Sequence, residues 1–467
     1  MSPTPARLFA LILLAPSELF GQGGAQQTLM PMAEVVRRAV DRDPGVRARE
    51  ADRQAARSEI DRTRAERLPK LYLTTNAGAG QEPNDLADVL LTGLTPVAVT
   101  DPLTRSRLAD LSASRPYVIP GARLENLLFD GGRTGAAIRS ARLAADKAAV
   151  DEGATRDAEA YAAASNFLNL AYDQAFGRYL EEYEGVAELT AAAVRDQAAA
   201  GRATDSEALA AEAKLQAAKT ALEDNRDDLR VSSDLLRQQA GLLGETAFDT
   251  RPLESRLVAT QSPPSPLLNQ EGGRPFSSEK NADLQIAGLD TRLQEEAVQT
   301  ARGRRLPSVN LVGEYGFAFS NLLFTFRPGY NVGVQATFPL FTSHELEQGV
   351  KTELYRADAA RLRQEKIAAS LRQEDLKTSA QERKLARDSQ AAQSQLTQAE
   401  ENYRVARLKY DQGAGSASNL TEGAEQLLNS RRQYLDLARS SLLLHWTRLR
   451  MQGELLGELL GEGQLRK

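Results

Sequence analysis

The chain has 467 residues, enough for about three domains of ordinary size, and its 58 basic and 63 acidic residues give a net charge of −5. It contains no cysteine and only two histidines, which excludes disulfides, thiol catalysis and a lipid-modified N-terminal cysteine, and argues against a metal site built from several histidines. The near balance of charge lacks the basic surface that nucleic-acid binding requires. We therefore predict no nucleic-acid partner, no metal and no cofactor.

The N-terminus predicts a secretory signal peptide over residues 1–25. Arg7 precedes the apolar run Leu8–Ala15, and the small residues that follow suit cleavage near Ala25. This run is the longest clean apolar stretch of the chain, and it is too short to cross a bilayer as a helix, which needs about 20 residues. A buried N-terminal helix is the alternative interpretation. If the signal is correct, the protein is exported.

The first half of the exported chain, residues 26–250, predicts a helix, a β-hairpin and a helical hairpin. Alternating apolar and polar residues favour two strands within the β-hairpin at about 69–129. The apolar positions are Leu71, Leu73 and Ala77 in one strand and Val118, Ala122 and Leu124 in the other. A long segment, roughly 81–114, separates these strands and has no counterpart in the second half.

The helical hairpin of this half is predicted at about 131–245. No proline occurs between Pro120 and Pro252, and good helix formers dominate the block. Gly201 interrupts it, and Thr204 with Glu207 three residues later has the spacing of a capping box that starts a new helix. The first arm has about 70 residues and would be on the order of 105 Å long. A connector rich in proline, glycine and serine follows at 251–278.

The second half, residues 279–467, repeats the same order, with a β-hairpin at about 307–341 and a helical hairpin at about 343–460. Alternation through Val309–Phe319 and Tyr330–Leu340 gives each strand one apolar face, and the aromatic residues near its ends suit the interface of a membrane. No proline occurs after Pro339, and Gly413 interrupts the helical block at the place that matches Gly201.

Leucines at seven-residue intervals run along the second arm of each helical hairpin and predict coiled-coil seams. They are Leu215, Leu222, Leu229, Leu236 and Leu243 in the first half, and Leu428, Leu435, Leu442, Leu449 and Leu456 in the second. The offset between the two sets is 213 throughout, which indicates an internal duplication. A second apolar stripe, formed by Leu437, Leu444 and Met451, predicts that the last long helix packs between two neighbours, as in a ring of helices.

These elements predict an α+β fold, mostly helical and internally duplicated, with four β-strands per protomer. Four strands cannot close a barrel, and open strand edges cannot stand in lipid, so strands in a membrane would require an oligomer. Three chains would supply a 12-stranded trimeric β-barrel above an α-barrel made of the long helical hairpins.

The junctions between strand and helix resemble those of TolC-like outer membrane efflux proteins. The resemblance is carried by the run Leu127–Arg133, its weaker second copy Phe338–Ser343, and the turn Tyr410–Gly413 with Ser416, Leu420 and Glu425 after it. It spans nearly the whole chain from about residue 29 to 460. It implies a homotrimer in the lipid of the outer membrane, with most of the chain in the periplasm. It also implies a periplasmic adaptor protein and an inner-membrane transporter as partners, for efflux or for type I secretion.

The resemblance also implies roles for residues at the helix tips, where such channels are held shut. Tyr410 matches a gating tyrosine, Glu422 an acidic constriction residue, and Glu207 or Asp205 its acidic partner in the first copy. Asn419 stands where an acid is common and Gly415 where an arginine would act, which leaves Arg202 as a substitute cation. The gate candidates are Tyr410, Glu422, Asn419, Asp411, Glu207, Asp205 and Arg202, and the adaptor-docking candidates are Gly201, Arg202, Gly413, Ala414 and Gly415. A solvated helix face is the alternative role for each acid.

Two other classes of function are alternatives to the channel. Enzymatic activity is not expected, because the sequence has no phosphate-binding loop of Walker type and both His344 and His445 fall on predicted helices, outside any Ser–His–Asp order. The main alternative is an exported coiled-coil scaffold without channel activity, which would be recovered as a soluble monomer or dimer without detergent.

Overall fold

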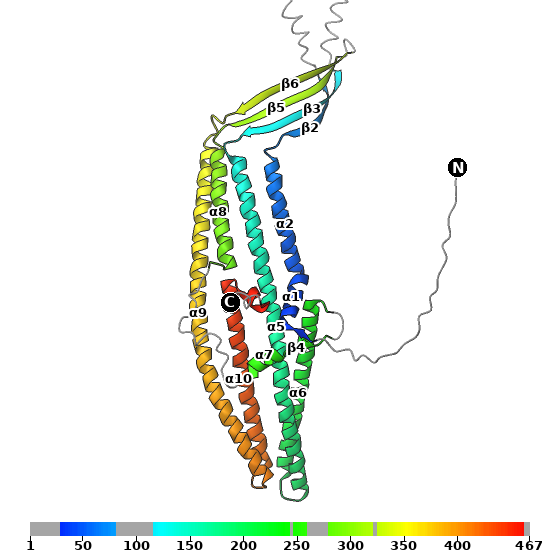
Figure 1. Cartoon of the computed structure of the whole chain (residues 1–467), viewed down its shortest axis with the longest axis vertical. Coiled ribbons are helices and arrows are strands. Elements are labelled where there is room, and N and C mark those ends of the chain that lie inside the picture. The colour runs from blue at the N-terminus through cyan, green and yellow to red at the C-terminus, as the bar shows by residue number, and fades with distance from the viewer. Residues whose placement is uncertain (1–28, 81–114, 243–245, 259–278, 321–324, 462–467) are drawn as a thin grey trace, which may run out of the picture.

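The computed structural model describes residues 29–80, 115–242, 246–258, 279–320 and 325–461. The predicted signal peptide, the long segment at 81–114 and most of the predicted connector lie outside the described residues. The chain forms an elongated molecule with a small sheet at one end and long helices running away from it (Figure 1). None of the described helices is long and apolar enough to cross a membrane.

The two halves have the same order of elements, which confirms the predicted duplicated, mostly helical fold. The first half contains α1 (Met32–Arg42), α2 (Pro44–Ala65), β2 (Lys70–Gly80), β3 (Arg115–Phe129), α5 (Arg133–Ala199) and α6 (Asp205–Ala240). The second contains α8 (Ala282–Gly303), β5 (Ser308–Ser320), β6 (Thr325–Thr337), α9 (Glu345–Asp411) and α10 (Ala417–Gln452). Corresponding long helices have equal lengths, since α5 and α9 have 67 residues each and α6 and α10 have 36 each.

The strands form one antiparallel sheet in the order β2-β3-β5-β6, so the two β-hairpins join side by side through β3 and β5. Its register aligns Leu73 with Ala122, Ala122 with Tyr315, and Tyr315 with Tyr330. Because side chains of paired residues lie on the same face of a sheet, this row is apolar across all four strands. The sheet ends at β2 on one side and at β6 on the other.

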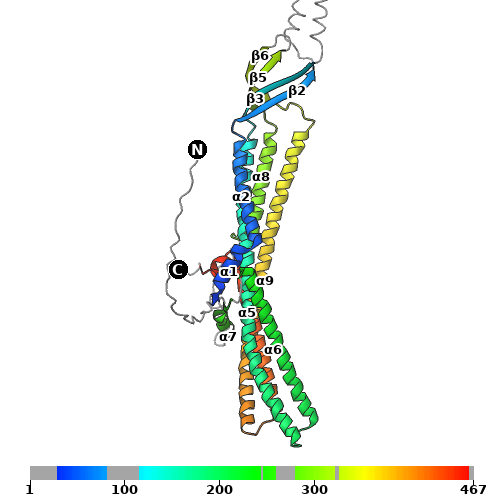
Figure 2. The ribbon, with the colours of Figure 1, turned by 90° about the vertical axis from the view of Figure 1, so that its right-hand side faces the viewer.

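The long helices form a curved layer (Figures 1 and 2). The helices that make up this layer differ between the end near the sheet and the end far from it. Next to the sheet, the packing order is α2, α5, α8 and α9; farther away it is α6, α5, α10 and α9. α5 and α9 run through both levels. α10 packs against both α5 and α9, as its two apolar stripes predicted, and Met451 of the second stripe is buried.

The main hydrophobic core lies at mid-height, where the short helices meet α5, α6 and α10. Among its most buried side chains are Phe167 and Leu168 from α5, Leu236 from α6, Leu435 from α10 and Leu455 from α11 (Leu455–Leu459). Phe167 stacks edge-on against Phe248 at a centroid distance of 6.1 Å. Phe248 belongs to β4 (Phe248–Asp249), which pairs in parallel with β1 (Met30–Pro31) and ties the start of the described chain to this core.

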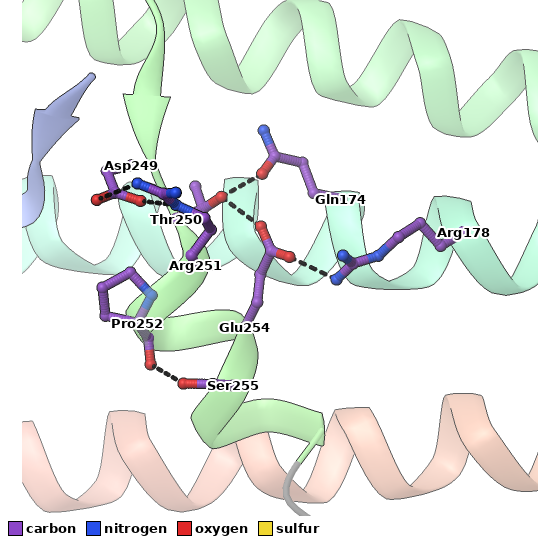
Figure 3. A network of polar contacts seen from close by, with 8 residues as sticks. All are labelled: Gln174, Arg178, Asp249, Thr250, Arg251, Pro252, Glu254 and Ser255. Atoms are coloured by element: carbon purple, nitrogen blue, oxygen red, sulfur yellow. Dashed lines mark hydrogen bonds and ion pairs between the residues drawn. The ribbon is translucent and has the colours of Figure 1, made fainter. Parts of the chain in front are cut away.

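The beginning of the predicted connector is a helix, α7 (Arg251–Val258). Leu253 and Leu257, four residues apart, lie on one face and are buried in the core, which anchors the helix. Polar contacts fix it to α5: Thr250 donates to Gln174 and Glu254, and Glu254 accepts from Arg178 (Figure 3). The composition of this segment predicts only a linker. The segment is nevertheless helical, because the burial of its leucines in the core outweighs the presence of a proline.

The helix expected at the start of each half begins with its own N-terminal cap. In the first half the helix breaks between α1 and α2. Asp43 caps α2 by accepting a hydrogen bond of 2.7 Å from the Val46 amide, and Pro44 occupies the first helical position, where its missing N–H costs nothing. In the second half, α8 starts after its own cap at Asn281.

Candidate functional site at the helix tips

Two interhelical turns lie together at the end of the molecule that is farthest from the sheet (Figures 1 and 2). One joins α5 to α6, and the other joins α9 to α10. Gly201 and Gly413 end the first arms with φ of +68° and +72°, a left-handed conformation that glycine adopts without steric cost. The predicted positions of both turns are therefore confirmed by the backbone.

The two turns close through the same backbone hydrogen bonds. In the first, the Gly201 amide donates to Ala198 at 2.9 Å and the Arg202 amide to Gln197 at 2.8 Å. In the second, the Gly413 amide donates to Tyr410 at 2.9 Å and the Ala414 amide to Lys409 at 2.8 Å. These bonds satisfy carbonyls that a helix end would leave unpaired.

The first turn continues into a complete capping box. The Glu207 amide donates to Thr204 Oγ1 at 3.2 Å, and the Thr204 amide donates back to Glu207 Oε2 at 2.8 Å. These hydrogen bonds, from the backbone and the hydroxyl of Thr204, hold the pKa of the Glu207 carboxyl below its ordinary value. The Glu207 side chain is thus committed to its own helix within the protomer.

The second turn has only half of this arrangement. Ser416 caps α10 by accepting a hydrogen bond of 3.2 Å from the Asn419 amide, and among the described residues the Asn419 side chain makes no return bond. Glu422, one turn farther along, accepts a hydrogen bond of 3.1 Å from the Ser418 hydroxyl. Asn419 and Glu422 are both exposed, so their side chains are accessible from outside the protomer.

The remaining gate candidates are spread around the two turns. Tyr410 is half-buried in the last turn of α9, and Asp411 is the exposed final residue of that helix. Asp205 starts α6, and Arg202 is exposed in the first turn. Within the described residues of the protomer, no ion pair involves any of these side chains, and no hydrogen bond joins one turn to the other. The protomer therefore groups the candidates by turn and does not bring the two groups into contact.

The docking candidates lie on the outermost surface of the turns. Gly201, Arg202, Gly413 and Ala414 are exposed, whereas Gly415 is half-buried. A Cβ atom at Gly415 would come within 3.1 Å of the Tyr410 backbone nitrogen and of Lys409 Cβ. Gly415 therefore lets the second turn fold closely onto the end of α9.

Above the tips, the two hairpins are joined by charged contacts that the sequence did not reveal. Lys214 of α6 pairs with Glu425 of α10 at 3.3 Å, and Arg431 of α10 pairs with Glu182 of α5. Four arginines of α10 stack over aromatic rings of α5. The pairs are Arg431 with Tyr179, Arg432 with Phe176, Arg439 with Tyr172, and Arg450 with Tyr161, at 4.3 to 5.8 Å. The available signal was the spacing of Arg432, Arg439 and Arg450 by seven and eleven residues, which keeps them near one face of α10.

No group of His, Asp or Glu side chains among the described residues is placed to hold a metal ion. His344 is exposed at the start of α9, with Nδ1 3.2 Å from Glu347. His445 lies within α10, where burial lowers its pKa, an effect that Arg256 and Arg448 reinforce and that Glu458 and Glu382 oppose. The two histidines therefore lie in different surroundings, one exposed and the other largely buried.

The sequence and the fold both match known proteins. A family described as outer membrane efflux protein matches residues 35–242 and 277–451, which is most of the chain. The chain belongs to the outer membrane efflux protein family. It is an outer membrane channel with a periplasmic helical domain, and it is not an enzyme. No curated protein sequence matches the chain.

Several solved outer membrane proteins have a similar fold. VceC from Vibrio cholerae is 17% identical with a TM-score of 0.70, over 90% of this chain and 96% of that one. The CmeC outer membrane channel of Campylobacter jejuni is 16% identical with a TM-score of 0.69, over 92% and 88%. The open state of the MtrE outer membrane channel of Neisseria gonorrhoeae is 16% identical with a TM-score of 0.59, over 92% and 88%. At these identities the likeness concerns the fold.

Proposed function

We propose that this efflux channel acts as a homotrimer, the passive outer membrane conduit of a tripartite efflux or type I secretion system, gated at its helix tips. A periplasmic adaptor protein would dock on the tips and join the channel to an inner-membrane transporter. The observation that carries the proposal is the sheet, which exposes an apolar face and, within the described part of the chain, leaves both of its edges unpaired.

The apolar face of the sheet suits lipid. Leu73 is 91% exposed and Tyr330 84% exposed, and Leu71, Val332 and Val334 on the same face are also exposed. A monomer in water rarely exposes so continuous an apolar patch. The opposite face is polar: Arg123 lies 2.7 Å from Glu125 and 3.6 Å from Glu314, which suits a water-filled lumen.

The edges of the sheet require a partner in lipid. β2 pairs only with β3, and β6 only with β5, so the outer backbone groups of both edge strands are unpaired within the described part of the chain. Unpaired backbone groups are too costly in a bilayer to remain open. Joining β6 of one copy to β2 of the next is a head-to-tail contact, which closes after three copies into a barrel of twelve strands.

The gate is proposed to form between copies at the tips. Head-to-tail assembly would place the α9/α10 turn of one protomer beside the α5/α6 turn of the next. Tyr410, Asp411, Asn419 and Glu422 would then face Arg202, Asp205 and Glu207 of that neighbour. Acidic side chains repeated three times around a narrow pore would favour cations and repel anions. Gly201, Arg202, Gly413, Ala414 and Gly415 would offer the adaptor a surface of small residues beside one exposed arginine.

Conductance in planar bilayers tests the channel and its gate together. The purified protein should insert and give discrete channels, and Tyr410→Phe combined with Glu422→Ala should raise the single-channel conductance. The control is Tyr355→Phe with Glu353→Ala, the same chemical changes on α9 but near the end of that helix that adjoins the sheet. Unchanged conductance in the tip variant would count against those gate residues. A soluble protein without channels would instead favour the exported scaffold.

A further inference from the structure

The helix layer ends in two open faces far from the sheet. Within the described chain the short helix α1 packs near the C-terminal end of α6. Otherwise the order at that level is α6, α5, α10 and α9, which gives α6 and α9 one packed neighbour each. Both expose apolar side chains on the face turned away from that neighbour. Val231 of α6 is 58% exposed and Leu376 of α9 is 68% exposed, and Leu235 and Leu408 extend the two faces. Exposed apolar stripes on both ends of one layer indicate that something covers them.

Charges of opposite sign lie within these two stripes. On α6, Asp224 and Asp228 precede Val231 and Leu235 at intervals of four, three and four residues, which places all of them on one face. On α9, Arg383 and Arg387 follow Leu376 after seven and eleven residues, and Leu408 comes three heptads after Arg387. The face toward α10 is different, since it carries the buried residues Ser389, Ala392 and Leu396.

These charges have no ion-pair partners within the described part of the protomer. Asp224, Asp228, Arg383 and Arg387 are all exposed, and no ion pair of the described residues includes any of them. Other charges of α6 are paired along their own helix, such as Glu223 with Arg226 at 2.6 Å and Asp227 with Arg230 at 2.8 Å. These four charges share a face with the exposed apolar residues, unlike Lys219 of α6 and Lys384 of α9, which also form no ion pair among the described residues.

The two sets of charges also lie at the same height. Lys214 on α6 pairs with Glu425 on α10, and these two residues are equally far along the chain from Gly201 and Gly413 to within one position. Residues equally far from the two turns therefore lie level with each other. Counted from the turn glycines, the aspartates of α6 and the arginines of α9 fall at closely similar positions. At 1.5 Å per residue both pairs lie roughly 35–45 Å from the turns.

We propose that Arg383 and Arg387 of one protomer form ion pairs with Asp224 and Asp228 of the next copy of this chain. We call this contact the arginine clasp. It rests on the proposed head-to-tail trimer and specifies how its helices meet. The partner is a second copy, because the complementary charges and the matching apolar residues occur on the two opposite ends of one protomer, in line with the two sheet edges.

The arginine clasp would fix the register of neighbouring protomers. Apolar stripes with a seven-residue repeat can slide past each other by one repeat and still bury most of their surface. Charged pairs within such a seam penalise the wrong register, because a slip leaves charges beside apolar side chains without partners. The adjacent valine and leucines would also exclude water and strengthen the attraction.

Charge reversal tests the arginine clasp. Arg383→Glu with Arg387→Glu should cause loss of the proposed trimer on gels run in detergent without boiling, and so should Asp224→Arg with Asp228→Arg. Combining all four changes should restore it, because the attraction is rebuilt with opposite signs. Lys384→Glu is the matched control, since this exposed residue is next to Arg383 but turned by about 100° on the helix. Failure of the four-fold variant to regain trimer, with both double variants monomeric, would overturn the proposal.

Cross-linking provides a second readout that does not depend on stability. The chain has no cysteine, so Asp228→Cys with Arg387→Cys supplies one defined pair. Within a protomer, α5 and α10 separate these positions, and each packed helix adds about 8–10 Å, which is too far for a short cross-linker. Covalent trimers are expected with this pair and not with Asp228→Cys and Lys384→Cys. A native trimer without cross-links would refute the clasp but not the channel, whereas absence of any trimer in the unchanged protein would refute the proposed assembly.

Discussion

The two helical hairpins are copies of one unit, and they differ most at their tips. Both have arms of 67 and 36 residues, joined at Gly201 in the first hairpin and at Gly413 in the second. The first turn closes with a two-way capping box between Thr204 and Glu207. At the equivalent place in the second hairpin, Ser416 and Asn419 form a one-way cap. The duplication has thus kept the backbone of the turn and changed how firmly its side chains hold the start of the second arm.

A second difference lies inside the hairpins. In the first, the amide of buried Asn225 donates to the Asp173 carbonyl at 3.2 Å, and a Cβ at Gly177 would meet Asn225 Oδ1 at 2.5 Å. The corresponding residues of the second hairpin, 212 positions later, are Leu437 and Ser389. A buried asparagine in a coiled-coil seam fixes its register at some cost in stability. The first hairpin therefore has a buried hydrogen bond between its two helices, and the second has no asparagine at the corresponding position.

The largest loss of stability is expected from substitutions of buried leucines in the coiled-coil seams. Leu222 and Leu435 occupy equivalent positions in the two leucine repeats, and both are nearly fully buried. Leu435 belongs to the main core, in which several helices surround it, whereas Leu222 lies in the seam between α5 and α6. Leu435→Ala should destabilise the fold by about 3–5 kcal/mol and Leu222→Ala by about 2–3 kcal/mol, because the crowded site can collapse less around a cavity.

Urea unfolding of the detergent-solubilised protein, followed by circular dichroism, would measure this difference. Leu362→Ala is the control, because Leu362 is exposed on α9 and its removal leaves no cavity in the protomer. If Leu222→Ala and Leu435→Ala lower the free energy of unfolding by the same amount, the two leucines contribute equally to stability. That result would contradict the larger role assigned to the main core around Leu435.

The caps should give smaller, local effects. Thr204→Ala removes both hydrogen bonds of the Thr204 hydroxyl, which accepts from the Glu207 amide and donates to the Glu207 carboxylate, and should destabilise the start of α6 by about 1–2 kcal/mol. Ser416→Ala removes a single hydrogen bond and should destabilise the start of α10 by about 0.5–1 kcal/mol. Conversely, Asn419→Glu should complete a box in the second turn and slow the opening of α10. Hydrogen exchange of the amides at the two helix starts would measure each effect. If Ser416→Ala speeds amide exchange at the start of α10 more than Thr204→Ala does at the start of α6, the second turn has the stronger cap and the expected order is wrong.

Much of this architecture was predictable from the sequence because its signals are local. Two long stretches without proline predicted the helical hairpins, and Gly201 and Gly413 predicted their turns within a residue. The capping box of Thr204 and Glu207 was also correctly predicted. The helix α7 was missed, since its stability comes from burying Leu253 and Leu257 in a core assembled from distant segments.

The gate was less accessible to such reasoning. Glu207 was assigned by resemblance to the constriction, and within the protomer its carboxylate is bound to Thr204. The roles of Tyr410, Glu422 and Arg202 depend on side chains of neighbouring copies, and periodicity along one chain carries no information about those contacts. These roles remain predictions.

The smallest effect, and the sharpest contrast between the tips, is expected from pH. The pKa of Glu207 is lowered in the fold, so its carboxylate stabilises the first turn at pH values above the unfolded value of 4.5, and this contribution is lost as the pH falls through the lowered pKa. The cap of the second turn, Ser416 with Asn419, contains no titrating side chain. Acidification below about pH 4.5 should therefore loosen the first turn before the second.

Single cysteines in this cysteine-free chain allow the contrast to be measured. A mobility-sensitive label at Ala203→Cys should gain motion below about pH 4.5, and a label at Ala414→Cys should not. Glu207→Gln should make the first label insensitive to pH, because the neutral amide can still accept the hydrogen bonds but no longer titrates. Asn419→Glu should transfer the sensitivity to the second label. If both labels respond alike in the unchanged background, acid acts on the assembly as a whole and the difference between the tips is not set by their caps.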